Sequence, residues 1–127
     1  SQDWEAHRKF ANLLSAVAIE SNIHIHLVAH PRKAVSVDQA PDINDVAGGA
    51  DYARLAHNVV FVRRGQGLSS FDDLSPIQIA VRKQRYGSGF VGDITGWLNR
   101  RIRQFKEDQF DQKPTQYLPP EAYLDEV

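Results

Sequence analysis

Lys83 and Arg85 are the residues of this sequence that are best suited to chemistry, and they flank Gln84 at the end of an apolar run. Side chains on alternate positions of a strand point to the same side, so the two cations are expected to act as a pair. Residues 86–89 read Tyr-Gly-Ser-Gly, and their glycines allow a sharp turn beside the pair. The arrangement suits a phosphate group. An ordinary solvated strand end shows the same pattern, and the residues alone leave both interpretations open.

Three histidines form a second chemical pattern, because His24, His26 and His30 lie two and four positions apart and would share one face of a strand. Three imidazoles on one face can hold a metal ion. No Asp or Glu lies within the run to complete a ligand set, and packing against a helix is the commoner role for the first two. His30 differs because it ends the run, where open parallel sheets bind ligands, although a solvated strand-end histidine remains the alternative.

A third pattern is the pair Gly48-Gly49, which follows a polar loop and opens a predicted helix. Free backbone N–H groups at such a position can bind phosphate, and a plain helix start is the other interpretation. The 127 residues contain no G-x-x-x-x-G-K-[ST] motif and no apolar strand that ends in a magnesium-binding aspartate. No Ser-His-Asp or paired-carboxylate arrangement stands out either.

Hydrophobic periodicity predicts the elements that position these residues. An amphipathic pattern indicates a helix over residues 3–20, and a near-continuous apolar run indicates a buried parallel strand over residues 23–29. The remaining predicted elements are a short helix at 47–57, strands at 58–62 and 77–85, and a hairpin of 94–98 with 101–105. This order predicts an α/β layer with a mixed sheet that resembles half of a larger sheet.

The composition is that of one soluble globular domain, with 42% apolar residues and a net charge of -1. No apolar run reaches membrane-spanning length, so we expect no membrane partner. The sequence has no cysteine, which fits a cytoplasmic protein and excludes disulfides and thiolate zinc sites. It also has no methionine and begins inside a predicted helix, so we expect a fragment of a longer protein.

Charge is distributed unevenly near the end of the sequence. Residues 82–106 hold seven Lys or Arg and one acid, Asp93, whereas residues 107–127 hold six acids and one cation, Lys113. The basic segment suits a polyanion or an acidic subunit face, and the acidic tail could equally neutralise it within the same chain. The tail contains three prolines and is expected to lie extended along a surface or to be disordered.

Three blocks of the sequence, in this order, resemble the last three motifs of DnaB-type hexameric helicases, most closely the Twinkle and bacteriophage primase-helicase branch. The first block is HIHLVAHPRK at residues 24–33, the second is DVAGGADYARLAHNVVFVRR at 45–64, and the third is KQRYG at 83–87. The resemblance covers about residues 1–105. Three motifs in the family's order are far more specific than any one of them.

The resemblance implies a fold and a parent activity. Residues 1–106 would be the C-terminal half of a RecA-like P-loop NTPase core without its Walker A and B motifs, with a mixed, mainly parallel sheet and a terminal antiparallel hairpin. Residues 107–127 would be an acidic tail. The parent protein would be an ATP-dependent DNA helicase or primase-helicase with ATP and Mg²⁺ as cofactors. It would work as a homo-oligomeric ring, and the resemblance implies a hexamer. The isolated fragment is expected to be inactive, with neither cofactor bound.

The resemblance also assigns roles to single residues. His30 would sense the γ-phosphate, and Arg32, Lys33, Gly48 and Gly49 would belong to the segment that faces single-stranded DNA. Lys83 and Arg85 would reach into the ATP site of the neighbouring subunit as arginine finger and partner, and in an isolated fragment they should be exposed and unengaged. No metal site is expected in the fragment itself.

The sequence departs from the family's pattern at three places. Gly48-Gly49-Ala50 replaces the usual Gly-Ser or Ser-Gly, Ala47 stands where Arg is frequent, and His57 stands where an acid is common. Two other functions therefore stay open. One is a non-catalytic RecA-like module for assembly or DNA docking, and the other is a metal-dependent hydrolase that uses His24, His26 and His30.

Overall fold

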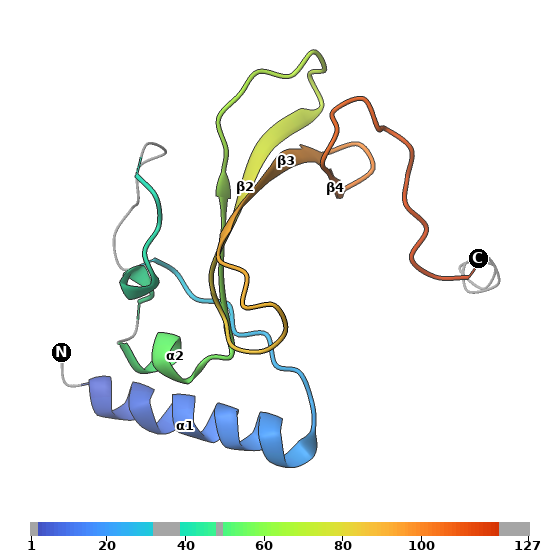
Figure 1. Cartoon of the computed structure of the whole chain (residues 1–127). Coiled ribbons are helices and arrows are strands. Elements are labelled where there is room, and N and C mark those ends of the chain that lie inside the picture. The colour runs from blue at the N-terminus through green and yellow to red at the C-terminus, as the bar shows by residue number, and fades with distance from the viewer. Residues whose placement is uncertain (1–2, 32–38, 48–49, 120–127) are drawn as a thin grey trace. The chain divides into compact units, whose positions relative to one another are not determined.

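The computed structural model of the chain describes residues 3–31, 39–47 and 50–119. Figure 1 shows the order of its elements along the chain. They are helix α1 (Trp4–Ser21), the short 3-10 helix η1 (Ile43–Asp45), helix α2 (Ala50–Leu55) and strands β1 (Asn58–Arg64), β2 (Leu74–Gln84), β3 (Gly92–Asn99) and β4 (Gln104–Lys106). The described part of the chain contains no helix that is long and apolar enough to cross a membrane.

Helix α1 confirms the element predicted from the i, i+3, i+4, i+7 spacing of apolar residues. It ends because Asn22 adopts a left-handed conformation with φ of 51°. The N–H groups of Asn22 and Ile23 then donate to the carbonyls of Ile19 and Ala18, which satisfies two carbonyls of the last turn. The helix is therefore closed at the point where the sequence pattern breaks.

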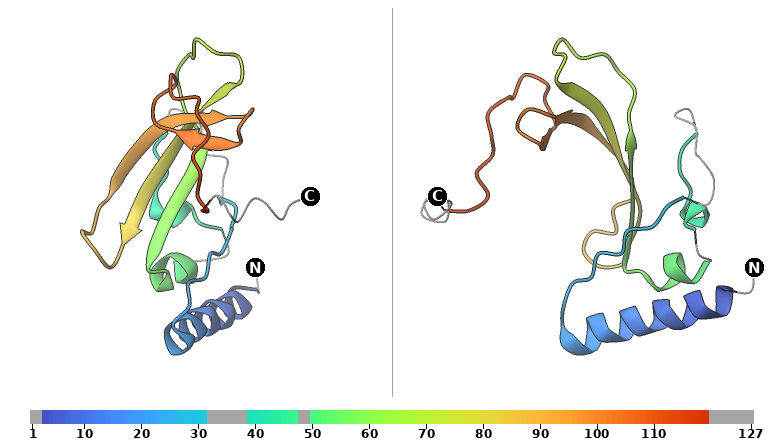
Figure 2. Two further views of the ribbon diagram at one scale, coloured as in Figure 1. Left: turned by 90° about the vertical axis from the view of Figure 1, so that its right-hand side faces the viewer. Right: turned by 180° about the vertical axis from the view of Figure 1, so that it is seen from behind.

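Helix α2 packs against α1, as both views in Figure 2 show. His7 Nδ1 lies 2.9 Å from the Tyr52 hydroxyl, and their rings meet edge to face. Arg8 of α1 lies 3.5 Å from the Asp51 carboxylate of α2. The buried alanines Ala11 and Ala53 allow the two helices to approach closely. Helix α2 is shorter than the predicted span of 47–57.

The four strands form one antiparallel sheet in the order β1-β2-β3-β4. The predicted hairpin is confirmed, since β3 and β4 pair antiparallel with Trp97 opposite Lys106. Gly96 is required there, because a Cβ at this position would lie 2.6 Å from the Lys106 carbonyl oxygen. The chain is thus an α/β protein, as expected, with a sheet built of neighbouring antiparallel strands.

The prediction of a mainly parallel sheet is wrong. Residues 23–30 form neither helix nor strand and follow a drawn-out path in Figure 1, with an isolated bridge between Pro31 and Val46 at their end. Leu27 and Val28 are 48% and 90% exposed, so the run is not buried as predicted. An apolar, β-branched run favours strand geometry, but a strand also needs a neighbouring edge to pair with, and that edge is not encoded in the run itself.

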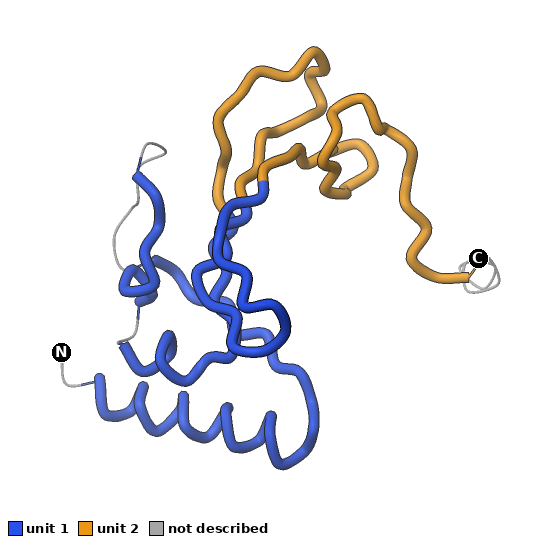
Figure 3. Tube along the Cα trace, viewed as in Figure 1, with its two compact units in different colours: residues 1–62, 79–94 blue, residues 63–78, 95–127 orange. Residues whose placement is uncertain are grey.

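The chain divides into two compact units, which Figure 3 draws in different colours. Unit 1 comprises residues 1–62 and 79–94, and unit 2 comprises residues 63–78 and 95–127. Among the described residues, the buried apolar ones are Leu74 in unit 2 and, in unit 1, Ala11, Ala53, Val59 and Ala80. Strands β1, β2 and β3 each contribute residues to both units.

Candidate functional site

The candidate site lies at the end of β2 in unit 1. The backbone N–H of Arg85 donates to the His57 carbonyl at 2.8 Å, which fixes the strand end beside the residue that precedes β1. Gln84 accepts from the backbone N–H of Phe90 at 2.8 Å and from the Ser88 hydroxyl at 3.2 Å. Its side chain thereby closes the following loop, in which Gly87 and Gly89 have positive φ. The predicted sharp turn is confirmed.

Lys83 and Arg85 both reach the last turn of α2. Lys83 Nζ donates to the carbonyls of Ala53 and Arg54 at 2.9 and 2.8 Å, and Arg85 Nη2 donates to the Arg54 carbonyl at 3.2 Å. The two cations therefore share one acceptor, which confirms that they point to the same side. The expectation that both would be exposed and unengaged is wrong. Lys83 is partly buried, and Arg85 is exposed but uses one donor.

The charges around Lys83 are positive. Burial lowers the pKa of Lys83 below its ordinary value of 10.5, and the nearby cations Arg85 and Arg54 lower the pKa further. No carboxylate of a described residue forms an ion pair with Lys83. The site is thus a cluster of three cations, Arg54, Lys83 and Arg85, which we call the cation cluster.

The nearest carboxylate belongs to Asp51, and it is committed to other partners. Arg54 Nη2 donates to Asp51 at 2.9 Å, and Arg8 lies 3.5 Å from the other oxygen. The Arg54 hydrogen bond, assisted by the charges of Arg8 and Arg54, lowers the pKa of Asp51 despite an opposing effect of burial. Asp51 therefore stays ionised and holds α2, while Lys83 and Arg85 remain without a counterion among the described residues.

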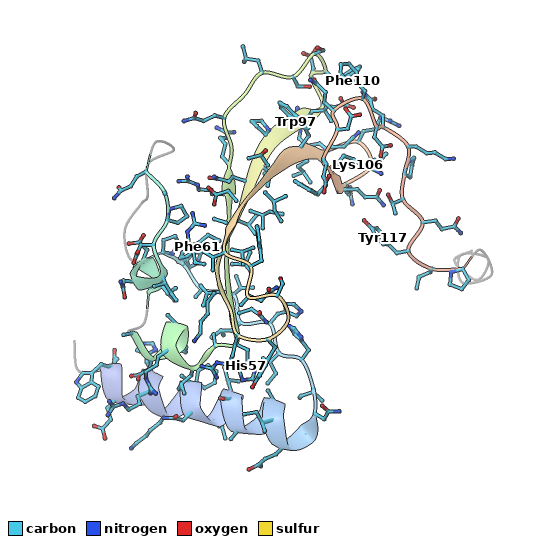
Figure 4. All side chains as sticks on the ribbon, in the orientation of Figure 1. His57, Phe61, Trp97, Lys106, Phe110 and Tyr117 are labelled. Atoms are coloured by element: carbon cyan, nitrogen blue, oxygen red, sulfur yellow. The ribbon has the colours of Figure 1, made fainter. Side chains whose placement is uncertain are left out.

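Aromatic rings border the cation cluster. The ring of His57, which Figure 4 labels, meets the ring of Tyr86 edge to face with centroids 5.4 Å apart. Tyr86 is 67% exposed. This ring contact joins the segment before β1 to the segment after β2. It is the second contact between them, after the hydrogen bond from the Arg85 N–H to the His57 carbonyl.

Arg82 shows by contrast what a structural cation looks like in the same strand. Its Nε donates to the Pro41 carbonyl at 2.7 Å, and its Nη1 lies 2.8 Å from the Asp93 carboxylate. Arg82 belongs to the basic segment of residues 82–106. It precedes Lys83 in β2, so its side chain points to the other side of the strand, and it pairs with Asp93, the one acid of that segment. It does not belong to the cation cluster.

The structure brings His30 close to the residues that precede Gly48-Gly49. The His30 carbonyl accepts from the Ala47 N–H at 3.0 Å, next to the bridge between Pro31 and Val46. The His30 side chain is exposed. Arg32, Lys33, Gly48 and Gly49 themselves lie outside the described residues.

His24 and His26 lie side by side, with ring centroids 4.3 Å apart and both side chains exposed. The shared face expected for this pair is confirmed. Among the described residues, however, no three His, Cys, Asp or Glu side chains gather in a way that could hold a metal ion. His30 does not complete a set with the other two.

The basic residues of the β3–β4 hairpin are largely engaged within unit 2. Asn99 is fully buried, and its Oδ1 accepts from the N–H groups of Arg101 and Ile102. Arg100 donates to the carbonyls of Asp72 and Asp73, and Arg101 lies 3.6 Å from the Asp73 carboxylate. The turn of the hairpin is therefore held by the buried Asn99 amide. The contacts of its two arginines with Asp72 and Asp73 hold it on the exposed side.

Residues 107–119 follow β4 without forming a helix or strand, and we call them the strap. Lys106, labelled in Figure 4, donates to the Thr115 hydroxyl at 2.7 Å and lies 3.5 Å from the Asp111 carboxylate. The Gln104 amide makes hydrogen bonds to both the N–H and the carbonyl of Thr115. Among the described residues, Lys106 and Asp111 form the one ion pair between the basic segment and the tail, so neutralisation within the chain is seen at Lys106 alone.

Sequence reasoning missed Arg54 and the α2 carbonyls that receive Lys83 and Arg85. A backbone acceptor leaves no mark in a sequence, because every residue carries one. The available signal was Arg54 itself, a cation in the last turn of a helix that leads directly into a strand. Comparison with known proteins adds nothing to this geometry, since no protein family, curated protein or solved structure matches the chain.

Proposed function

We propose that this chain is part of a ring-forming, ATP-dependent DNA helicase of the DnaB type and that it has the RecA-like fold of that family. The observation that carries the proposal is the convergence of Lys83 and Arg85 on one point at a strand end, without a counterion among the described residues. Guanidinium groups are frequent partners of phosphate oxygens, and the second cation adds to the positive potential at this point. The site fits a nucleotide phosphate that a neighbouring subunit holds.

The RecA-like part of the proposal requires further strands beside the antiparallel sheet, and two segments could accept them. Strand β1 stands at one edge of the sheet, where Val60 and Val62 are 48% and 69% exposed. The apolar run 23–30 also lacks a strand partner in the described part of the chain. A parallel strand supplied by residues beyond these 127 would give both segments a neighbour and bury their apolar side chains.

In the proposed reaction, this chain would stabilise the charge that develops on the terminal phosphate of ATP. ATP and Mg²⁺ supply the phosphoryl group and a divalent charge when they are bound. Arg85 has N–H donors that no described residue accepts, so it would stabilise the charge that develops on the terminal phosphate oxygens, an effect worth about 10³ to 10⁵ in rate for arginine fingers. Asp51 is the acid nearest the cluster and is already paired, so Mg²⁺ would be held by residues other than those described at this site.

One experiment on the complete coding region tests the enzyme against the docking module. We expect the complete protein to carry a P-loop lysine and a Walker B aspartate and to hydrolyse ATP faster when single-stranded DNA is added. The 127-residue chain alone should not hydrolyse ATP. A complete protein without both motifs would favour the non-catalytic module, and ATP hydrolysis by the isolated chain would contradict the assignment.

DNA binding has its own test, which uses the segment that carries Arg32 and Lys33. Replacing both residues by Ala should weaken binding of a labelled oligothymidylate and reduce the slope of log affinity against log salt by roughly 1 to 2. Replacing Lys9, an exposed cation of α1 that pairs with Glu5, by Ala is the control. An unchanged salt slope in the double variant would show that this segment faces elsewhere.

A further inference from the structure

Lys83 and Arg85 use their donors very differently. An ammonium group has three N–H donors, and Lys83 gives two of them to carbonyls at 2.8 and 2.9 Å. A guanidinium group has five, and Arg85 gives one of them to a carbonyl at 3.2 Å. Lys83 is partly buried, whereas Arg85 is exposed. The two members of the pair are thus not equivalent.

Helix α2 needs the contacts that Lys83 makes. The last carbonyls of a helix have no intrahelical partner, and a helix of six residues is not stable by itself. Lys83 satisfies two of these carbonyls and places a positive charge at the negative end of the helix. The other end of α2 directly follows residues 48–49, which the resemblance assigns to the DNA-facing segment. Lys83 therefore connects the end of β2 to α2, the helix that follows residues 48–49.

We propose that Lys83 is a positioning residue, which anchors the end of β2 to the last turn of α2, and that Arg85 alone of the pair contacts phosphate. The anchor makes the position of Arg85 depend on the position of α2. Under the proposed function, in which the segment that precedes α2 faces single-stranded DNA, α2 would couple DNA binding to the position of Arg85. The phosphate contact rests on the proposed function, whereas the anchor rests on the contacts of this chain.

The anchor can be tested on the 127-residue chain by amide hydrogen exchange. The Ala56 N–H donates to the Tyr52 carbonyl at 3.0 Å and reports on the last turn of α2. Lys83→Met keeps the length of the side chain and removes its donors, so exchange at Ala56 should become about tenfold faster. Arg85→Met, the matched control, should change it by less than about twofold. Equal effects of the two variants, or no effect of Lys83→Met, would overturn the anchor.

The division of roles is tested in the complete protein by measuring ATP hydrolysis as a function of DNA concentration. Arg85→Met should abolish stimulated hydrolysis at every DNA concentration. Lys83→Met should retain hydrolysis at saturating DNA but need about tenfold more DNA for half-maximal stimulation, because the anchor is weakened and the phosphate contact is kept. Loss of hydrolysis at saturating DNA in Lys83→Met would show that Lys83 contacts phosphate itself.

The two tests separate the inference from the proposed function. If the complete wild-type protein shows no DNA-stimulated hydrolysis, the proposed function fails, and with it the phosphate contact of Arg85. The Ala56 measurement would still decide whether Lys83 anchors α2. If hydrolysis is present and the two variants behave alike, the helicase assignment stands and the division of roles is wrong.

Discussion

Lys106 in unit 2 is buried and Lys83 in unit 1 is partly buried, and the two lysines have different partners. Lys106 is 8% exposed and faces a hydroxyl and a carboxylate, both from the strap. Lys83 faces two carbonyls and has two arginines nearby. A buried charge with a counterion fits a structural role. A partly buried charge among like charges costs stability, and such positions are frequent at functional sites.

We infer from this difference a functional role for the cation cluster and a structural role for the hairpin with its strap. The basic segment of residues 82–106 is therefore not one surface. Arg82 and Lys106 are paired with acids, and Arg100 and Arg101 hold the loop that contains Asp72 and Asp73. Lys83 and Arg85 are the members of the segment that meet at the end of α2.

The largest expected effect is on ATP hydrolysis, when an arginine of the cation cluster is replaced and compared with an arginine of the hairpin. In the complete protein, Arg85→Ala should lower DNA-stimulated ATP hydrolysis by roughly 10³ or more while leaving nucleotide binding nearly unchanged. Arg103→Ala, at an exposed position in the hairpin turn, is the matched control and should leave turnover within about twofold. Turnover by steady-state assay decides the matter. Near-normal hydrolysis in Arg85→Ala would contradict a functional role for the cation cluster.

The hairpin should instead respond in stability. Asn99→Ala removes the acceptor of two backbone N–H groups at a fully buried position, which should cost about 2 kcal/mol. Trp97 lies in the same strand, so chemical denaturation followed by its fluorescence, with Trp4 replaced by Phe, measures the loss. Asn58→Ala, at the exposed start of β1, is the control. An unchanged denaturation midpoint in Asn99→Ala would show that this amide does not hold the turn.

Parts of this picture could be predicted from the sequence because their causes are local. The spacing of Phe10, Leu13 and Val17 encodes α1, and the glycines at 87 and 89 encode the turn after β2. The state of residues 23–30 could not be predicted, since a strand depends on a partner edge elsewhere. The anchoring of Lys83 could not be predicted either, because its partners are backbone carbonyls that become available only where α2 ends.

The pH dependence of stability sharpens the contrast at Lys83. Its folded-state pKa is lowered below 10.5 by burial and by the charges of Arg85 and Arg54. Between the lowered value and 10.5, the unfolded chain binds a proton that the folded chain has released, so the free energy of unfolding rises with pH. The wild-type chain should therefore gain stability relative to Lys83→Met as the pH approaches 10.5. A difference that stays flat across this window, measured by urea denaturation, would contradict the burial of an unbalanced charge.

The smallest expected effect concerns the counterion of Lys106. Asp111→Asn removes the carboxylate that faces Lys106, and Asp108→Asn removes an equal charge from the same strap at a residue that contacts the Phe110 N–H. The Thr115 amide, held by Gln104, should exchange a few-fold faster in the first variant only, because partly exposed ion pairs contribute about 0.2 to 1 kcal/mol. Equal exchange in both variants would assign the effect to net charge.

The central claim is that Arg85 acts on a phosphate held by another subunit, and mixing subunits tests it most directly. Subunits of the complete protein with Arg85→Ala would be combined with subunits that lack the P-loop lysine, each inactive alone. Some interfaces in the mixed ring then join an intact nucleotide site to an intact Arg85, so the mixture should regain part of the DNA-stimulated ATP hydrolysis. A mixture that forms rings and remains as inactive as its components would contradict the claim.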